Sequence, residues 1–295
     1  MTRKSRFGFT VPATLGAYML AGSVLAQTSP AADTKASDAK LPEAFILAQA
    51  TPAPEQKPAE AKPAEPYTLT ANVGIYSQYI FRGLTQTDAK PAFQGGFDFT
   101  HESGFYLGTW GSNISWISDA GNCNHGCSLE WDIYGGWRHT WNEDWGLDVG
   151  VLQYYYPGSF NTSPFFKNPD TTELYIAGSW KWLSLKFSDN VATGTFGTPN
   201  SRGSWYLDLA AAYPLTEQWT LLGHVGRQEF HGSNNGVSNS VLNYTDYKAG
   251  VTYTFAGGWT IGGYWTDTNT NGSVWTIAGK NIGKSTGTAF IQKTF

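Results

Sequence analysis

Apolar and polar positions alternate along most of the chain after residue 66. The segment "NVGIYSQYIFRGLTQTDAKPAFQGGFDF" (Asn72–Phe99) sets Tyr, Ile and Phe against Gln, Arg and Asp. Strict alternation is typical of a β-strand with one apolar and one polar face. We predict a series of such strands bounded by turn-forming residues, at 68–82, 93–100, 104–116, 129–139, 145–156, 171–181, 183–188, 204–213, 219–230, 244–255, 259–267 and 286–295.

The two phases of these strands differ in chemistry. Leu147, Val149 and Val151 share the apolar phase of one strand, and Tyr79 and Phe81 continue that of the first. The opposite phase carries charged side chains along the whole chain, which indicates one shared polar interior. The candidate interior residues are Arg82, Asp98, Glu130, Asp132, Arg138, Asp148, Glu173, Lys181, Lys186, Asp208, His224, Asp246 and Lys248.

The connections between the strands alternate in length. Short turns such as "HES" and "PLTEQ" alternate with longer loops such as 157–170 and 268–285. Aromatic residues flank the short turns, as Trp141 and Trp145 do. Short periplasmic turns, longer outer loops and a girdle of aromatic residues are typical of membrane barrels.

We therefore predict an all-β fold, a transmembrane antiparallel up-and-down β-barrel over residues 67–295. Its apolar phase, including Tyr79 and Phe81, is expected to face lipid. A closed barrel suits lipid because it leaves no unpaired backbone edge. Twelve strands put both termini on the periplasmic side, and counts of ten or fourteen stay open. A soluble β-sandwich or lipocalin-like binder is the alternative, which does not account for the alternating loops and the girdle.

Composition agrees with this prediction. Charged residues make up 14% of the chain and aromatic residues 16%, with 13 Trp. Soluble proteins usually have about 25% charged residues. The formal net charge of -4 provides no basic surface, so nucleic acid is not an expected partner.

The N-terminal part has a different texture. Residues 1–26 combine early Lys and Arg with an apolar stretch and "SVLAQ", which predicts a signal peptide cleaved after Ala26. A membrane anchor is the alternative, but Pro and Gly interrupt this short stretch. Residues 27–66 are rich in Pro, Ala, Glu and Lys, and "TPAPEQKPAEAKPAEP" predicts a disordered periplasmic linker.

The two cysteines, Cys123 and Cys127, lie in "GNCNHGCS". In an exported chain such a close pair predicts a local disulfide. A metal site that also uses His125 is the alternative, for which no fourth ligand is evident. We expect no metal and no organic cofactor.

One segment also carries a family resemblance. "YIFRGLTQTDAKPAFQGGFDF", followed by "SGFYLGTWGSN", resembles the TorF-type porin family of proteobacterial outer-membrane proteins. The resemblance is clearest over Asn72–Asn113 and implies a barrel in the cell outer membrane, without implying a solute. The final Phe295 resembles the terminal aromatic by which the barrel-assembly machinery recognises its substrates, although Lys293 departs from that pattern.

Three function classes follow. The leading expectation is passive diffusion of small polar solutes or ions through a charged lumen, with a weak preference for cations. A plugged barrel serving as anchor, receptor or adhesin is the second, with loop 268–285 or the outer residues Phe160, Phe165 and Phe166 as candidate elements. The third class, an enzyme, is not expected because none of the five histidines belongs to a recognised motif. Expected partners are outer-membrane lipid and small solutes, and a homo-oligomer stays open.

Overall fold

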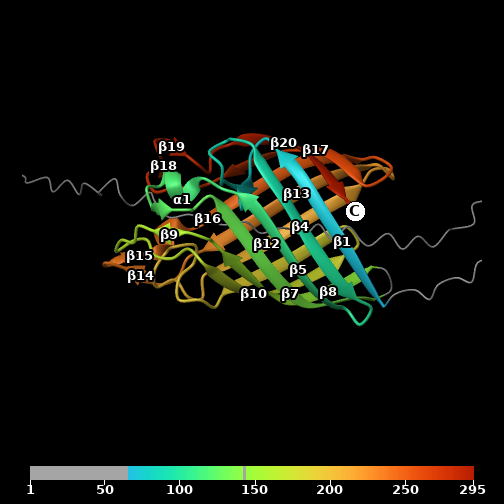
Figure 1. Cartoon of the computed structure of the whole chain (residues 1–295), viewed down its shortest axis with the longest axis horizontal. Helices are drawn as coiled ribbons and strands as arrows, with labels where there is room; N and C mark the ends of the chain where they lie inside the picture. The colour runs from blue at the N-terminus through green and yellow to red at the C-terminus, as the bar shows by residue number, and fades with distance from the viewer. Residues whose placement is uncertain (1–65, 142–143) are drawn as a thin grey trace, which may run out of the picture. The chain divides into compact units, whose positions relative to one another are not determined.

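The computed structural model of the chain describes residues 66–141 and 144–295. Twelve strands of these residues close into one antiparallel barrel, as the alternation predicts (Figure 1). The barrel strands are β1 (Tyr67–Tyr76), β4 (Ala92–His101), β5 (Phe105–Asn113), β7 (Leu129–Trp141), β8 (Trp145–Tyr155), β10 (Thr171–Trp180), β11 (Leu183–Asn190), β12 (Trp205–Pro214), β13 (Trp219–Glu229), β16 (Tyr244–Thr254), β17 (Trp259–Thr268) and β20 (Thr286–Thr294). The predicted signal peptide (1–26), and the predicted linker (27–66) except its last residue, lie outside the described residues.

Each barrel strand pairs with its neighbours in sequence, and β1 pairs with β20 to close the barrel. This pairing leaves no open edge in the barrel wall, which a sheet in lipid requires. Tyr67 lies opposite His101, beside the short turn between β4 and β5. The two ends of the barrel sequence therefore lie at the end of the short turns, which supports the even strand number.

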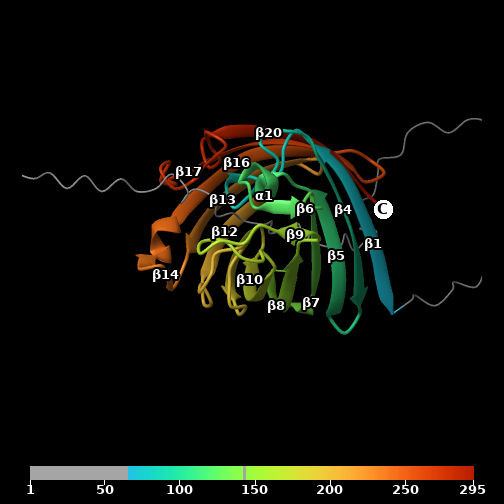
Figure 2. The ribbon, with the colours of Figure 1, turned by 60° about the vertical axis from the view of Figure 1, so that its left-hand side comes forward.

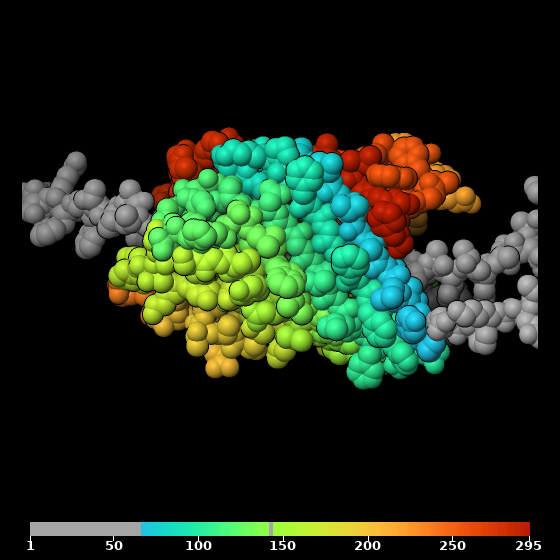
Figure 3. Space-filling model, in the orientation of Figure 1, coloured from blue at the N-terminus to red at the C-terminus, as the bar shows by residue number. Residues whose placement is uncertain are grey.

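The outer surface of the barrel is apolar. Along β7, Leu129, Trp131 and Ile133 are exposed, whereas the residues between them are buried. The other strands repeat this alternation, and Figure 3 shows the first strands side by side across one face of the wall. Exposed aromatic residues gather at the short turns, among them Trp145, Trp180, Tyr213, Trp219, Phe255 and Trp259. An apolar surface with such a girdle is that of a transmembrane barrel.

Smaller elements lie in the long loops, at the end opposite the C-terminus (Figure 1). Figure 2 turns this end forward and shows α1, β6 and β9 within the outline of the strands. Within the described ranges, no helix has the length and apolar character to cross a membrane. These elements are β2 (Ile80–Phe81), β3 (Leu84–Thr85), α1 (Trp116–Asp119), β6 (Cys123–His125), β9 (Ser159–Phe160), β14 (Ser233–Asn234), β15 (Val237–Ser238), η2 (Asn239–Leu242), β18 (Thr276–Ile277) and β19 (Lys280–Asn281).

The predicted disulfide is confirmed. Cys123 and Cys127 are bonded, with their Cα atoms 5.8 Å apart. Cys123 also lies opposite Phe160, because β6 pairs with β9 in the next long loop. The disulfide therefore belongs to the loop end and not to the barrel wall.

The first strand is shorter than predicted. β1 ends at Tyr76, and residues 77–82, which the alternation assigned to the same strand, leave the wall. The alternation continues through residues 77–82 because part of this segment, β2, is itself a strand. It pairs with β3 in a small separate sheet.

Candidate functional site

A hairpin from the first long loop occupies the barrel interior. Its two strands, β2 and β3, are joined at Arg82 and Gly83, whose φ angles are 42° and 81°. Two positive φ angles at the centre of a two-residue turn are those of a type I′ hairpin, whose twist matches paired strands. We call residues 77–87 the lumen hairpin.

The apolar side chains of the lumen hairpin are buried. Tyr79, Phe81 and Leu84 are 6%, 1% and 0% exposed. The expectation that Tyr79 and Phe81 face lipid is therefore wrong. These rings pack inside the barrel, where Tyr79 meets Trp110 and Phe81 meets Tyr154 at ring-centroid distances of 5.6 and 6.3 Å.

Arg82 reaches across the interior from the tip of the hairpin. Its Nη2 donates to both carboxylate oxygens of Glu173 on β10, at 3.0 and 2.8 Å. Its Nη1 donates to Oε1 of Gln228 on β13, at 2.7 Å. The guanidinium also lies 4.1 Å from the ring centroid of Tyr206 on β12. Three strands of the wall thus provide an acceptor or an aromatic face for one buried cation.

Other contacts fix the rest of the hairpin. The hydroxyl of Tyr79 donates to Glu130 on β7 at 2.8 Å, and the amide of Gln78 donates to Thr286 on β20 at 2.8 Å. Gly83 lies so close to the wall that a Cβ there would be 2.4 Å from Cγ2 of Thr268. The hairpin is therefore joined to both sides of the barrel and crosses its interior.

Asp132 is a further acidic residue near Glu130 and Glu173. Its side chain is fully buried on the interior face of β7, and both carboxylate oxygens lack a hydrogen-bond partner among the described residues. Its electrostatic neighbours are Glu130 and Glu173. A buried charge normally has a partner, because its desolvation is costly. Asp132 and Glu130 on β7 and Glu173 on β10 thus form a group of acidic residues, of which Glu173 pairs with Arg82.

A turn in the loop after β11 also packs against the lumen hairpin. Phe196 and Gly197 have φ angles of 48° and 81°, and Phe196 is fully buried. Its ring packs against Phe81 and Tyr154, with centroids 5.8 and 5.1 Å apart. Loop 268–285, which the sequence analysis considers as a constriction, contacts the hairpin, since Thr85 N donates to Ile282 O.

A second charged group lies on β12, β13 and β16. His224 lies between two carboxylates, with Nδ1 2.7 Å from Asp208 and Nε2 2.6 Å from Asp246. The hydroxyl of Tyr206 donates to Asp246 at 3.0 Å. Lys248, also on β16, lies 5.6 Å from the ring centroid of Tyr264 on β17. The predicted residues Asp208, His224 and Asp246 are thus brought together by the register of three strands.

The remaining predicted residues face the interior nearer the short turns. Tyr134 donates to Asp98 at 2.7 Å, and Tyr106 donates to Asp148 at 2.6 Å. Aromatic faces receive the cations: Arg138 lies 3.9 Å from the Tyr106 centroid, and Lys186 lies 3.9 Å from the Tyr175 centroid.

Lys181 departs from the predicted pattern. It lies in the two-residue turn between β10 and β11, with a φ angle of 54°, and about half of its side chain is exposed. Its ammonium is 3.9 Å from Asp144, in the neighbouring turn. The reversal ends the alternation one residue before Lys181, so its side chain does not join the interior face.

Sequence reasoning did not single out Gln228, Tyr206, Tyr154 and Phe196. The first three share the inward phase with predicted residues of their own strands, so the same alternation could have found them. Phe196 lies in a loop, where that signal does not apply.

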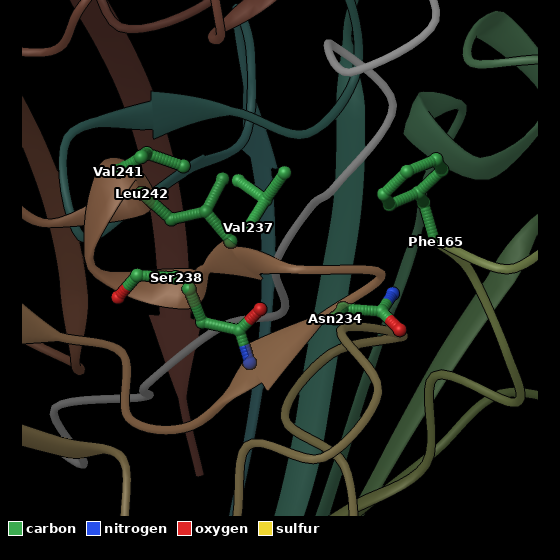
Figure 4. Close-up of a pocket in the computed structure, with 7 residues that line it drawn as sticks. Phe165, Asn234, Val237, Ser238, Val241 and Leu242 are labelled. Carbon is green, nitrogen blue, oxygen red and sulfur yellow. The ribbon is translucent and has the colours of Figure 1, made fainter.

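A small pocket at the loop end is lined by loop residues and by none of the barrel strands. Phe165 comes from the loop before β10 and lies opposite Val237 and Leu242 (Figure 4). Asn234 also donates a hydrogen bond to Pro164 O, which ties the two loops together. Of the three aromatic residues expected to form an outer surface, Phe166 is buried at 1% exposure. Among the described residues, no group of three or more His, Cys, Asp and Glu side chains is arranged to hold a metal ion.

Comparison with solved structures gives barrels of similar layout. They include the KdgM porin, with 9% identity and a TM-score of 0.49 over 77% of this chain and 99% of that chain. The NanC porin has 11% identity and a TM-score of 0.47 over 77% and 99%. An outer membrane channel from Pseudomonas putida F1 has 11% identity and a TM-score of 0.44 over 80% and 100%. These likenesses are low, so the fold is taken from the strand topology of this chain.

No curated protein sequence matches the chain. Residues 60–295 match the model of a family described as "bacterial protein of unknown function (Gcw_chp)". The match covers the whole barrel and most of the chain, and the chain belongs to this family of bacterial proteins.

Proposed function

We propose that the protein is an outer-membrane channel for the passive diffusion of small polar solutes or ions, and that the lumen hairpin is its gate in the closed position. The observation that carries this proposal is the charged interior. Carboxylates, cations and hydroxyls lie on the inner face from the loop end to the short turns. A barrel of about twelve strands is wide enough that its wall side chains alone do not fill it.

The lumen hairpin is assigned as the gate because it occupies the barrel interior. The central space is occupied by a loop segment, which is joined to the wall by polar contacts of Gln78, Tyr79 and Arg82 and by the packed rings of Tyr79 and Phe81. The strands of the hairpin, β2 and β3, pair with each other and are not part of the barrel sheet. A hairpin held this way can leave the lumen without unfolding the wall.

A non-conducting barrel is the second candidate, and one observation favours it. The hairpin contacts β7, β10, β13 and β20, and its rings stack on Phe196 and Trp110. If these contacts never release, the barrel serves as an anchor or receptor that displays its long loops.

Single-channel recording of the whole chain in a planar bilayer separates the two. Discrete current steps with a weak preference for cations support the channel. A folded, heat-modifiable barrel that gives no steps supports the non-conducting alternative. The triple variant Asp98→Asn, Glu130→Gln, Asp132→Asn is expected to shift the reversal potential toward anion preference. Glu217→Gln, in an exposed short turn, is the matched control and is expected to leave it unchanged.

The remaining assignments belong to the same proposal. Residues 1–26 direct export, residues 27–66 form a periplasmic linker, and both barrel termini face the periplasm. Phe295, which is 69% exposed at the end of β20, is the signal for the barrel-assembly machinery. The predicted interior residues other than Lys181 line the open pathway. The resemblance to TorF-type porins is consistent with these assignments.

A further inference from the structure

We infer that the place now occupied by the Arg82 side chain is a binding site for a guanidinium group carried by a solute, and that Arg82 is its resident occupant. This inference rests on the proposed function, since it requires the lumen hairpin to leave. We call this place the guanidinium site. Its fixed part consists of Glu173, Gln228 and Tyr206, and Asp132 is an acidic neighbour of Glu173.

The fixed part belongs to the wall and not to the hairpin. Glu173, Gln228 and Tyr206 lie on three separate barrel strands whose pairing does not involve residues 77–87. When the hairpin leaves, an acceptor carboxylate, an acceptor amide oxygen and an aromatic face keep their positions. These groups match the planar, five-donor guanidinium better than they match a compact ammonium.

The charge of the site calls for a cation. With Arg82 withdrawn, Glu173 loses its ion pair and Glu130 loses the hydrogen bond from Tyr79. Asp132, the acidic neighbour of Glu173, adds two fully buried side-chain oxygens that have no hydrogen-bond partner among the described residues and can accept from a donor. A buried carboxylate that has lost its cation, as Glu173 would, favours a positively charged guest and opposes an anionic one.

The aromatic lining supports the same class of guest. The Arg82 guanidinium lies 4.7 Å from the Phe81 centroid and 5.7 Å from the Phe196 centroid, in addition to Tyr206. Phe81 leaves with the hairpin, whereas Tyr206 stays on β12 and Phe196 lies in a separate loop. Guanidinium groups stack on such faces.

Chemical rescue tests the inference. The whole chain carrying Arg82→Ala has a vacant guanidinium site, which methylguanidinium at millimolar concentration can fill. We expect methylguanidinium to block the current of Arg82→Ala channels and to raise the thermal unfolding midpoint of that variant, because a ligand stabilises the state it binds. Urea has the same planar shape without the charge, and it is expected to do neither.

Second variants identify the residues. We expect Glu173→Gln or Asp132→Asn, each added to Arg82→Ala, to weaken methylguanidinium binding. The concentration needed for block and for the thermal shift is expected to rise about tenfold in each case, the scale of a lost charge-assisted contact. Adding Glu217→Gln, in an exposed turn, is expected to change neither. Equal effects of methylguanidinium and urea, or effects that survive both carboxylate changes, overturn the inference.

The two readouts keep the inference apart from the channel proposal. A thermal shift that depends on Glu173 and Asp132, in protein that gives no current steps, supports the guanidinium site and overturns the channel. Current steps without block or thermal shift support the channel and overturn the guanidinium site.

Discussion

Removing the side chain of Arg82 is the sharpest test of the gate. In the closed position Arg82 and Glu173 form an ion pair at 2.8 Å, with side chains 1% and 3% exposed. Arg82→Ala leaves the Glu173 carboxylate buried without its cation, beside Asp132. Removing one partner of a buried pair costs about 3 to 5 kcal/mol. Once the hairpin has left, water reaches Glu173. The substitution therefore raises the free energy of the closed position and leaves that of the open position unchanged.

This difference sets the size of the effect. A change of about 1.4 kcal/mol alters an equilibrium tenfold, so the closed-to-open ratio of Arg82→Ala is expected to fall about a hundredfold or more. Single-channel recording measures this ratio directly as open probability. Arg202→Ala is the matched control, because it removes an exposed arginine from the loop that carries Phe196 and leaves the interior unchanged.

The reasoning fails if Arg82→Ala folds to a heat-modifiable barrel whose open probability equals that of the unchanged protein and of Arg202→Ala. In that case the hairpin is held by its stacked rings and not by the buried ion pair. An increase equal to that of Arg202→Ala contradicts the reasoning in the same way, because a change in net charge alone then explains it.

Three further predictions concern the loops. Gly83→Ala is expected to raise open probability, because its φ of 81° is strained for alanine and its Cβ would overlap the wall; Gly121→Ala, with a φ of 73° and open space, is the control. The pKa of Asp88 is lowered by a hydrogen bond from Lys280, so this loop contact is present above the ordinary carboxyl pKa and is lost as pH falls through the lowered value. Open probability is therefore expected to rise below about pH 4, and Lys280→Met to abolish that rise. Reducing the 123–127 disulfide is expected to speed protease cleavage of its loop while the heat-modifiable barrel band persists, because the bond closes a short loop outside the wall.

The wall of the barrel follows from the sequence because one physical rule governs every strand. Lipid outside and polar groups inside require period-two alternation, and turns of few residues leave no other pairing than between neighbours. The ends of β4, β8 and β17 therefore lie within one or two residues of their predicted positions. Lys181 shows where the rule stops, since a residue at a positive φ in a tight turn no longer belongs to either face.

The interior clusters require information that alternation does not contain. His224 lies between Asp208 and Asp246 because β12, β13 and β16 are paired with Asp208 and Asp246 both opposite Gly226. A shift of two residues in either pairing would keep every inward side chain inward and would separate these three. The sequence predicts which face each residue occupies, whereas the register decides which residues meet.

The lumen hairpin was misassigned for a related reason. A strand inside the barrel and a strand in its wall both have two unlike faces, so Tyr79 and Phe81 continue the phase of β1 after the chain has left it. The turn at Arg82 and Gly83 is the local signal of the departure, since a two-residue turn with a glycine marks a hairpin too short to span a membrane. Arg82 itself carries the stronger argument. A cation that ends a wall strand can remain hydrated, whereas one at the tip of an inward hairpin must find a carboxylate across the lumen, and Glu173 lies 91 residues away in sequence. The proposed closed position thus rests on long-range contacts between a loop and the wall, which local pattern could not predict, and the Arg82–Glu173 ion pair is the one that a single substitution tests.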